Sequence, residues 1–464
     1  MGAEPIKPRI VLVPFPAQGH VTPMLHLAHA IQSHGFTTTL AVPDFIHRRL
    51  TTNANLSYST VELISIPSGE GDGGELKDFQ SIVNAMENYM PGRFEEILRG
   101  YRPVTCVVVD LLASWAILVA KQCGLAVAGF WPAMTASYRV ISAIPTLMLE
   151  GIISESGIPL CNEDIELSTE LNLHNDVLVK LTSKELPWLV GDSATCKSRF
   201  NFWSKIIDRT RTLEFILNNS FPGEEGKFDK QFKNDTRNAP QVLQVGPLLK
   251  YNNSKCNNPT MWQIDSSCIK WLNLQPERSV IYVSFGSWVG PIGSEKIKEL
   301  ALGLENSGRP FLWVLKKEKA WQSGLPEGFT KKIEGRGKIV EWAPQEEVLK
   351  HKSIGCYITH CGWNSTLEAI QHAKPQLCYP ISGDQFINCS YIVKVWGIGI
   401  KLDQTEQHAV QDCIQKVVEG KDGEEMLERV FVLRRNVMEG SASDEARNNL
   451  RIFVDSLRRD VRIC

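Results

Sequence analysis

CYITHCGWNSTLEAI, residues 356–370, joins a short apolar run to a helical pattern through a single glycine. The run CYIT predicts a buried strand, Gly362 permits a tight turn, and STLEAI continues with the spacing of a helix. Backbone N–H groups of the turn and the dipole of the helix then face whatever binds at the end of the strand. The stretch therefore predicts a strand–turn–helix unit of an α/β fold, with an anion beside the turn.

The same stretch has three chemical interpretations. His360 beside Cys361 suggests a metal site, but no further ligand follows at a fixed spacing, and Cys356 belongs to the same strand. The triplet NST at 364–366 is a glycosylation acceptor, which matters only in a secreted protein. The third interpretation is a diphosphate cradle, in which the turn and its polar side chains act together. We expect the cradle, with Cys361 as a small buried packing residue and no metal ion.

Similar apolar runs recur on both sides of this unit. They are rich in Val and Ile and apolar on both faces, as buried parallel strands are, and helical spacers such as SEKIKELALGLENSG separate them. We predict an α/β chain of two doubly wound, Rossmann-like parallel-sheet domains facing a cleft. The first series of runs lies at 9–15, 37–42, 61–66, 106–110 and 126–131, and the second at 280–286, 311–315, 338–342, 356–360 and 376–380.

The boundary between the two series is VGPLLKYNNSKCNNP (245–259), which is rich in Asn and lacks periodicity, as a linker does. We expect an N-terminal domain over 1–247, a C-terminal domain over 248–445, and a helix over 446–464 that packs back on the N-terminal domain. From 160 to 200 the sequence gives no topology beyond helix signals around TSKELPWL.

Composition excludes several classes of partner. The 464 residues are 43% hydrophobic and 22% charged, typical of a soluble globular protein, and the formal net charge of −2 favours neither nucleic acid nor anionic lipid. The apolar region 104–136 carries Asp110 and Lys121, so we expect buried strand and helix rather than stable membrane insertion. The N-terminus lacks the basic region and cleavage site of a signal peptide. We expect a cytoplasmic monomer whose twelve cysteines, without a CxxC pair, pack as thiols.

Two polar residues follow strands of the first series. His20 lies near a helix N-terminus, where the dipole keeps the imidazole neutral and able to accept a proton. Asp110 ends the buried run CVVVD and needs a partner for its carboxylate. Together they predict a general base and the group that orients it. The alternatives are a structural histidine and a helix-capping aspartate. His26 and His29, on the same helix, are expected to be surface or packing residues.

The segment GEGDGG, at 69–74, matches the G-x-G-x-x-G pattern of dinucleotide sites. Glu70 and Asp72 lie inside it and Glu75 follows, so a pyrophosphate would meet three like charges. We expect a flexible surface loop, which argues against a dinucleotide dehydrogenase.

Further candidate residues follow strands of the second series. Ser287 offers a second turn beside the cradle, and Trp342 offers a flat face for uracil. Glu368 lies one helical turn beyond Ser365, a reach suited to the two hydroxyls of a ribose. Asp384, with an amide beside it, suits the paired hydroxyls of a hexose. The structural alternatives are core aromatics for Trp342 and Trp363, a solvated helix residue for Glu368 and a helix cap for Asp384.

The segment from Trp342 to Gln385 resembles, over its full 44 residues, the signature box of plant family-one UDP-glycosyltransferases, inverting enzymes of the GT-B fold. The matching features are the opening WAPQ, the block HCGWNS, Glu368 and the closing DQ. PFPAQGHVTPML near the start and SFGS at 284–287 extend the resemblance to both domains. It departs at Ala373-Lys374-Pro375, and at Pro132, where some relatives have a hydroxyl residue that helps to position the sugar.

The resemblance implies an acceptor site in the N-terminal domain and a UDP-sugar site in the C-terminal domain. In the family, the residues matching Trp363, Asp384 and Gln385 hold the sugar, and the glutamine usually accompanies glucose. We expect the acceptor near Phe15, residues 67–90, Trp131 and residues 140–200. The implied donor-site residues are Ser287, Trp342, Ala343, Gln345, His360, Gly362, Trp363, Asn364, Ser365, Glu368, Asp384 and Gln385.

The expected reaction moves glucose from UDP-glucose to a hydroxyl of a small lipophilic acceptor, such as a flavonoid, another phenolic compound or a terpenoid. His20, oriented by Asp110, would take the hydroxyl proton in a single displacement, giving a β-glucoside. The sequence contains no Asp-x-Asp motif, so neither a metal ion nor another cofactor is expected. A non-catalytic UDP-sugar-binding protein and a nucleotide-sugar epimerase are the alternatives. A binding protein has no use for a placed base, and the pair of PAQGH and Asp110 is not expected in an epimerase.

Overall fold

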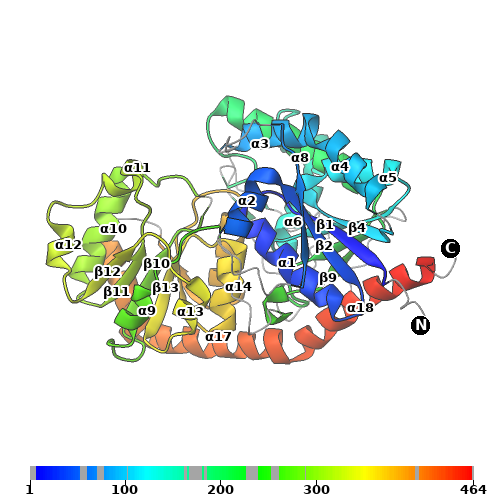
Figure 1. The fold of residues 1–464 in the computed structure, drawn as a ribbon. Coiled ribbons are helices and arrows are strands. Elements are labelled where there is room, and N and C mark those ends of the chain that lie inside the picture. Colours follow the sequence, from blue (N-terminus) through cyan, green and yellow to red (C-terminus); the bar gives the residue numbers. More distant parts are fainter. Residues whose placement is uncertain are drawn as a thin grey trace.

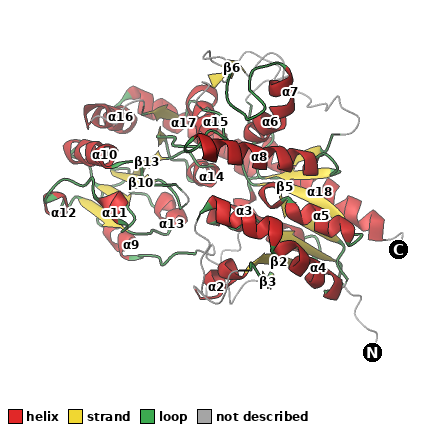
Figure 2. Ribbon diagram, turned by 90° about the horizontal axis from the view of Figure 1, so that it is seen from above, coloured by secondary structure: helices red, strands yellow, loops and turns green. Residues whose placement is uncertain are grey.

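A computed structural model describes residues 7–52, 60–69, 78–101, 103–160, 165–166, 180–181, 185–225, 239–251, 261–287, 289–402 and 407–461. Two parallel sheets lie side by side, one in each half of the molecule (Figure 1). Helices lie on both sides of the strands when the molecule is seen from above (Figure 2). The predicted α/β class with two doubly wound sheets is confirmed.

The N-terminal sheet has the strand order β3-β2-β1-β4-β5-β8-β9, with every pair parallel. Because β1 pairs with both β2 and β4, the winding direction reverses between β1 and β4. Ligands bind beyond the carboxyl ends of strands at such a reversal. The strands are β1 (Arg9–Val13), β2 (Thr37–Pro43), β3 (Glu62–Ile66), β4 (Cys106–Asp110), β5 (Ala126–Trp131), β8 (Phe215–Asn218) and β9 (Gln241–Gln244).

The C-terminal sheet is parallel too, in the order β12-β11-β10-β13-β14-β15. Its winding reverses between β10 and β13, so the turns after these two strands are neighbours. The strands are β10 (Val280–Ser284), β11 (Phe311–Val314), β12 (Gly337–Val340), β13 (Ile354–Thr359), β14 (Gln376–Cys378) and β15 (Gly399–Lys401). The short strands β6 (Ile165–Glu166) and β7 (Lys180–Leu181) form a separate antiparallel pair.

The helices follow the strands in the usual alternation. Those of the N-terminal half are α1 (Gln18–Gln32), α2 (Asp44–Thr52), α3 (Phe79–Asn88), α4 (Met90–Gly100), α5 (Trp115–Gln122), α6 (Thr135–Ser142), α7 (Ile144–Leu149) and α8 (Ser193–Thr210). Those that come later are α9 (Ser267–Leu272), α10 (Ser294–Asn306), α11 (Lys319–Gln322), α12 (Phe329–Lys332), α13 (Gln345–Lys350), α14 (Trp363–Gln371), α15 (Gln385–Ser390), α16 (Gln407–Glu419), α17 (Lys421–Glu439) and α18 (Ser441–Val461).

Every apolar run of the two series forms a strand, as predicted, and the region 104–136 forms β4, α5 and β5. Within the described parts of the chain, no helix is both long and apolar enough to span a membrane. The strands β8, β9 and β15 were not predicted. GEGDGG, apart from Gly69, lies outside the described residues.

The sequence gives helix signals around TSKELPWL without a topology, and the described part of this stretch, from Glu185, is not helical. Its described part is a turn segment that runs to Asp192. Pro187 and Gly191, which has a φ of 98°, break any helical path there. The Asp192 carboxylate instead accepts a hydrogen bond from the Thr195 N–H at 2.8 Å and caps the start of α8.

Two long helices, α17 and α18, run along one side of both halves (Figure 1). α17 packs on α14 in the C-terminal half, and α18 packs along β9, the edge strand of the N-terminal sheet. There the Asn449 side chain donates to the Gln244 carbonyl at 2.9 Å, and Phe453 meets Phe215 edge to face. α18 begins at Ser441, ahead of the position expected from the sequence.

The Phe453 contact generates a stability prediction. Phe453→Ala should lower the free energy of unfolding by about 3–5 kcal/mol, because it removes a fully buried ring and leaves a cavity against Phe215. The midpoint of urea unfolding, followed by circular dichroism, measures the effect. Ile452→Ala is the matched control on the same helix: its side chain is 40% exposed, and the change should stay within about 0.5 kcal/mol. Equal midpoints for the two variants would contradict the prediction.

Candidate active site

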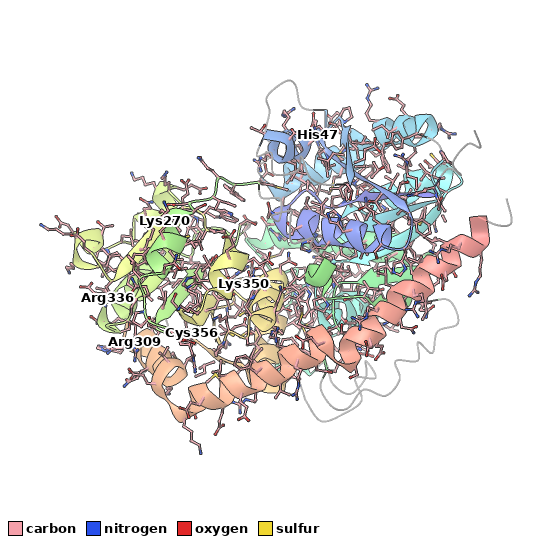
Figure 3. All side chains as sticks on the ribbon, turned by 60° about the horizontal axis from the view of Figure 1, so that its bottom comes forward. His47, Lys270, Arg309, Arg336, Lys350 and Cys356 are labelled. Carbon is pink, nitrogen blue, oxygen red and sulfur yellow. The ribbon has the colours of Figure 1, made fainter. Side chains whose placement is uncertain are left out.

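A cavity of about 850 Å³ lies between the carboxyl ends of the two sheets. Its size is that of a small-molecule site, and both halves of the chain line it. His20 and all twelve expected donor-site residues are among its lining, while Asp110 is fully buried and hydrogen-bonded to His20. Lys350, which also lines the cavity, lies on the side of the C-terminal half that faces the N-terminal half (Figure 3).

His20 and Asp110 form the predicted pair. The His20 Nδ1 is 2.7 Å from Asp110 Oδ2, and the Asp110 carboxylate also accepts the N–H groups of Phe15 and Leu112. Asp110 therefore holds the imidazole and also caps the short helical turn at Leu111–Ala113. Its two predicted roles, as the partner of His20 and as a helix cap, are compatible. Because the proton on Nδ1 points at the carboxylate, Nε2 keeps a lone pair for a substrate proton.

The first turn of α1 places His20 against the C-terminal half. α1 begins at Gln18 without a side-chain cap, and His20 is its third residue. The Asn364 amide donates to the Gly19 carbonyl at 2.8 Å, so the turn expected to hold phosphate also holds the peptide next to the base. Sequence reasoning assigned Asn364 to the donor alone and missed this contact.

His360, at the end of β13, occupies a slot between two glycine turns. A Cβ at Gly286 would lie 2.8 Å from its ring, and one at Gly362 would lie 2.3 Å from its Nε2. Burial, with a smaller contribution from the charge of Lys316, lowers the pKa of His360 to about 4. The ring is therefore neutral at pH 7. No residue within the described ranges hydrogen-bonds to its buried Nδ1.

The turn after His360 leads into α14 with its first N–H groups free of any side-chain cap. An anion placed there meets these N–H groups and the positive end of the helix dipole. Ser365, in the first turn of α14, is 7% exposed and lines the cavity. Ser287, after β10, lines it from the neighbouring strand. The predicted cradle is thus assembled from two adjacent turns.

Cys361 is fully buried, as expected of a packing residue. The statement that only Cys356 lies near it is wrong, because the fold brings Cys378 from β14 and Cys389 from α15 to it. The three sulfur atoms lie within 4.8 Å of one another. Burial raises the pKa of each of Cys361 and Cys378 well above the usual thiol value, which favours packed thiols. Linear spacing carried no signal for this cluster.

Glu368 belongs to a buried polar network rather than to a solvated helix face. Its Oε2 accepts from Gln345 Nε2 at 2.6 Å, and Gln345 also donates to Ser365 at 3.0 Å. The hydroxyls of Tyr282 and Tyr357 both donate to the side-chain oxygen of Gln345. Burial raises the pKa of Glu368 to about 7. The solvated alternative is therefore wrong.

The aromatic residues of the box have structural contacts as well as cavity faces. Trp342 stacks on Trp262 with centroids 5.3 Å apart. Trp363 is nearly fully buried: its indole N–H donates to the Asn219 carbonyl at 2.7 Å, and its ring stacks on Phe221. Trp363 therefore joins the two halves of the chain while it lines the cavity.

Asp384 and Gln385 close the C-terminal part of the site. Asp384 stands at the N-cap position of α15, but its side chain makes no capping bond, so the cap interpretation is wrong. It accepts from Asn388 at 3.0 Å; burial raises its pKa, and the charge of His20 opposes that rise. The Gln385 oxygen accepts the N–H groups of Ile381 and Ser382. The Asp384 carboxyl and the Gln385 amide therefore line the same cavity as His20.

The N-terminal part of the cavity is largely apolar. Each region expected to line it does so: Phe15, Phe79 from 67–90, Trp131, and Pro187 and Val190 from 140–200. Arg199, near the end of the expected range 140–200, also lines the cavity, whereas Trp203 lies outside every expected range and was missed, since α8 itself was not predicted. The cap at Asp192 followed by the aromatic pattern FNFW was the available signal.

Comparison with known proteins identifies relatives over the whole chain. A family model described as UDP-glucoronosyl and UDP-glucosyl transferase matches residues 256–434. UDP-glycosyltransferase 82A1 of Arabidopsis thaliana is 44% identical over 472 residues, covering 97% of this chain and 99% of the relative. Flavonol 3-O-glucosyltransferase UGT76E12 of the same plant is 30% identical, covering 99% and 98%.

Solved structures of this kind have the same fold. Os79 from O. sativa in complex with UDP superimposes with a TM-score of 0.78 at 27% identity, covering 97% of this chain and all of that one. Phytolacca americana UGT2, complexed with UDP-2fluoro-glucose and pterostilbene, gives 0.79 at 25% identity, covering 98% of this chain and all of that one. The expected GT-B fold is confirmed. Because it is 44% identical over nearly its full length to UDP-glycosyltransferase 82A1, the chain belongs to the plant family-one UDP-glycosyltransferases.

Proposed function

We propose that this UDP-glycosyltransferase moves glucose from UDP-glucose to a hydroxyl of a small lipophilic acceptor, with inversion to a β-glucoside. The observation that carries the proposal is the 2.7 Å contact between His20 and Asp110 at the cavity, opposite the cradle at His360. His20 held by Asp110 can accept a proton, and the turn after His360 can bind a leaving anion. This combination suits group transfer rather than binding alone.

In the proposed step, His20 Nε2 takes the proton of the acceptor hydroxyl while the oxygen attacks the anomeric carbon. The bond from that carbon to the diphosphate breaks, and UDP leaves with the electron pair. The imidazolium that forms is stabilised by the buried Asp110 carboxylate. Asp384 and Gln385, which line the cavity, are proposed to hold the sugar hydroxyls.

The leaving diphosphate is proposed to rest on the uncapped N-terminus of α14, with Ser365, Ser287 and His360 as further donors and no metal ion. Because His360 is neutral, it supplies a hydrogen bond rather than a charge. The main charge stabilisation then comes from backbone N–H groups and the helix dipole. Glu368 is proposed to accept the ribose hydroxyls, and Trp342 to stack on uracil.

The apolar wall around Phe15, Phe79, Trp131 and Trp203 supports a flat, lipophilic acceptor, such as a flavonoid, another phenolic compound or a terpenoid. One relative is a flavonol glucosyltransferase, and one related structure holds pterostilbene. Action as a monomer stays a prediction from the sequence. The cytoplasmic location stays a prediction from the sequence.

His20→Ala tests the proposed base. Transfer from UDP-glucose to a phenol should fall by roughly 10²- to 10⁴-fold, the contribution of a general base, while the dissociation constant of UDP changes little. UDP release and calorimetric UDP binding measure the two effects. His29→Ala is the matched control, since His29 lies on α1 away from the cavity lining and should leave transfer unchanged. Near wild-type transfer by His20→Ala would show that the base lies elsewhere.

Glu368 predicts a pH dependence of donor binding. Ribose hydroxyls donate to the ionised carboxylate, so the binding-competent fraction falls as pH drops through the pKa of about 7. UDP-glucose, whose diphosphate keeps a constant charge, should bind about tenfold more weakly at pH 6 than at pH 8. Titration calorimetry measures the ratio. Glu368→Gln should bind weakly at both pH values with the ratio lost, and an unchanged ratio in that variant would assign the titration to another group.

A further inference from the structure

One fixed cation stands in the apolar part of the cavity. Of the described N-terminal residues that line it, only Arg199 carries a permanent charge, and none carries a carboxylate. The carboxylates of the lining are Glu346, Glu347, Glu368 and Asp384, all from the C-terminal half. An apolar wall with a single guanidinium is therefore the distinctive chemistry of the acceptor side.

Arg199 has no anionic partner within the part of the chain that the structure describes. Its guanidinium lies over the Phe79 ring, 4.8 Å from the centroid, and its Nε is buried without a hydrogen bond. Burial lowers its pKa, but an arginine stays charged at neutral pH. A partly buried charge without a partner is unfavourable, so a counter-ion at this position would be strongly bound.

Other half-buried arginines of this half are paired. Arg209, also on α8, makes two hydrogen bonds of 2.7 Å to the Glu87 carboxylate. Arg139, on α6, lies 2.5 Å from Glu225. Arg199 differs from both because its charge faces a cavity instead of a carboxylate, which points to a ligand as its partner.

A chain of ring contacts connects this cation to the base. The rings of His20 and Phe15 are 5.2 Å apart, those of Phe15 and Phe79 are 6.4 Å apart, and Arg199 lies on Phe79. A flat ligand lying along these rings has one end at His20 and the other at the guanidinium. Burial raises the pKa of Asp384 and a positive charge on His20 opposes that rise, so an acidic side chain already lies at the His20 end of the cavity.

We propose that the acceptor is a flat hydroxy acid whose carboxylate pairs with Arg199 while its hydroxyl, at the opposite end, lies at His20. A guanidinium binds a carboxylate through two parallel hydrogen bonds, which fixes the orientation of the acceptor. This inference rests on the proposed transfer function and names its acceptor class. The product is an ether-linked glucoside with a free carboxylate, because the hydroxyl oxygen, not the carboxylate, forms the new bond.

The test compares acids with their neutral esters. The probes are 4-hydroxyphenylacetic acid, 3-(4-hydroxyphenyl)propanoic acid and 4-(4-hydroxyphenyl)butanoic acid. Each is compared with its methyl ester, with UDP-glucose as donor at pH 7.5. The wild type should favour the best acid over its ester by about 10- to 100-fold in kcat/KM, the value of a charge-assisted pair. Arg199→Gln should bring the ratio close to one, and Arg199→Lys, which keeps the charge, should retain part of it. Lys197→Gln is the matched control, since it removes an exposed charge from the same helix outside the cavity.

Binding without turnover separates this inference from the proposed function. Quenching of tryptophan fluorescence during titration, in the absence of donor, gives the affinity for each acid and ester. If acids bind better than esters and the preference depends on Arg199, the inference stands even when no probe yields UDP, and only the proposed transfer fails.

Three results would overturn the inference. The first is an equal preference in wild type and Arg199→Gln, and the second is failure of every acid in the series to bind. The third is a glucose adduct that mild alkali removes, because an acyl ester would place the carboxylate at His20.

Discussion

The hydrogen bond from the Asn364 amide to the Gly19 carbonyl fixes the register between the two halves of this enzyme. On one side it holds the first turn of α1, which carries His20; on the other it holds the turn that starts α14. The proposed base and the proposed anion site come from separate sheets, so neither sheet alone determines the distance between them. Trp363 and Phe221 add an apolar contact beside this bond. The geometry of transfer thus depends on a contact between domains.

Much of the fold and the site could be predicted because both follow from local rules. Buried runs such as CVVVD form parallel strands, and polar residues beyond their carboxyl ends, such as His20 and His360, line the cavity at the switch points. The predictions failed where local signal is short or absent. β15 has three residues, and Arg199 and the sulfur neighbours of Cys361 are defined by contacts between distant segments. No spacing rule encodes such contacts.

Burial gives the site its electrostatic character. His360 is kept neutral and Glu368 is brought to half ionisation near pH 7, although neither has an exceptional partner in the sequence. Glycine turns pack against the His360 ring, and Gln345, which donates to Glu368, accepts from two tyrosine hydroxyls. A side chain larger than hydrogen at Gly286 or Gly362 would displace the His360 ring.

The packing of α18 on β9 has a consequence for how the protein is made. β9 is the last strand of the N-terminal sheet, and Phe215 on the adjacent β8 is covered by Phe453 of α18. Residues 441–461 leave the ribosome only after the whole C-terminal sheet has been synthesised. The N-terminal domain, which would otherwise fold first, thus keeps an uncovered apolar edge throughout translation. Its folding is completed by a segment that follows the second domain, which couples the maturation of the two domains in time.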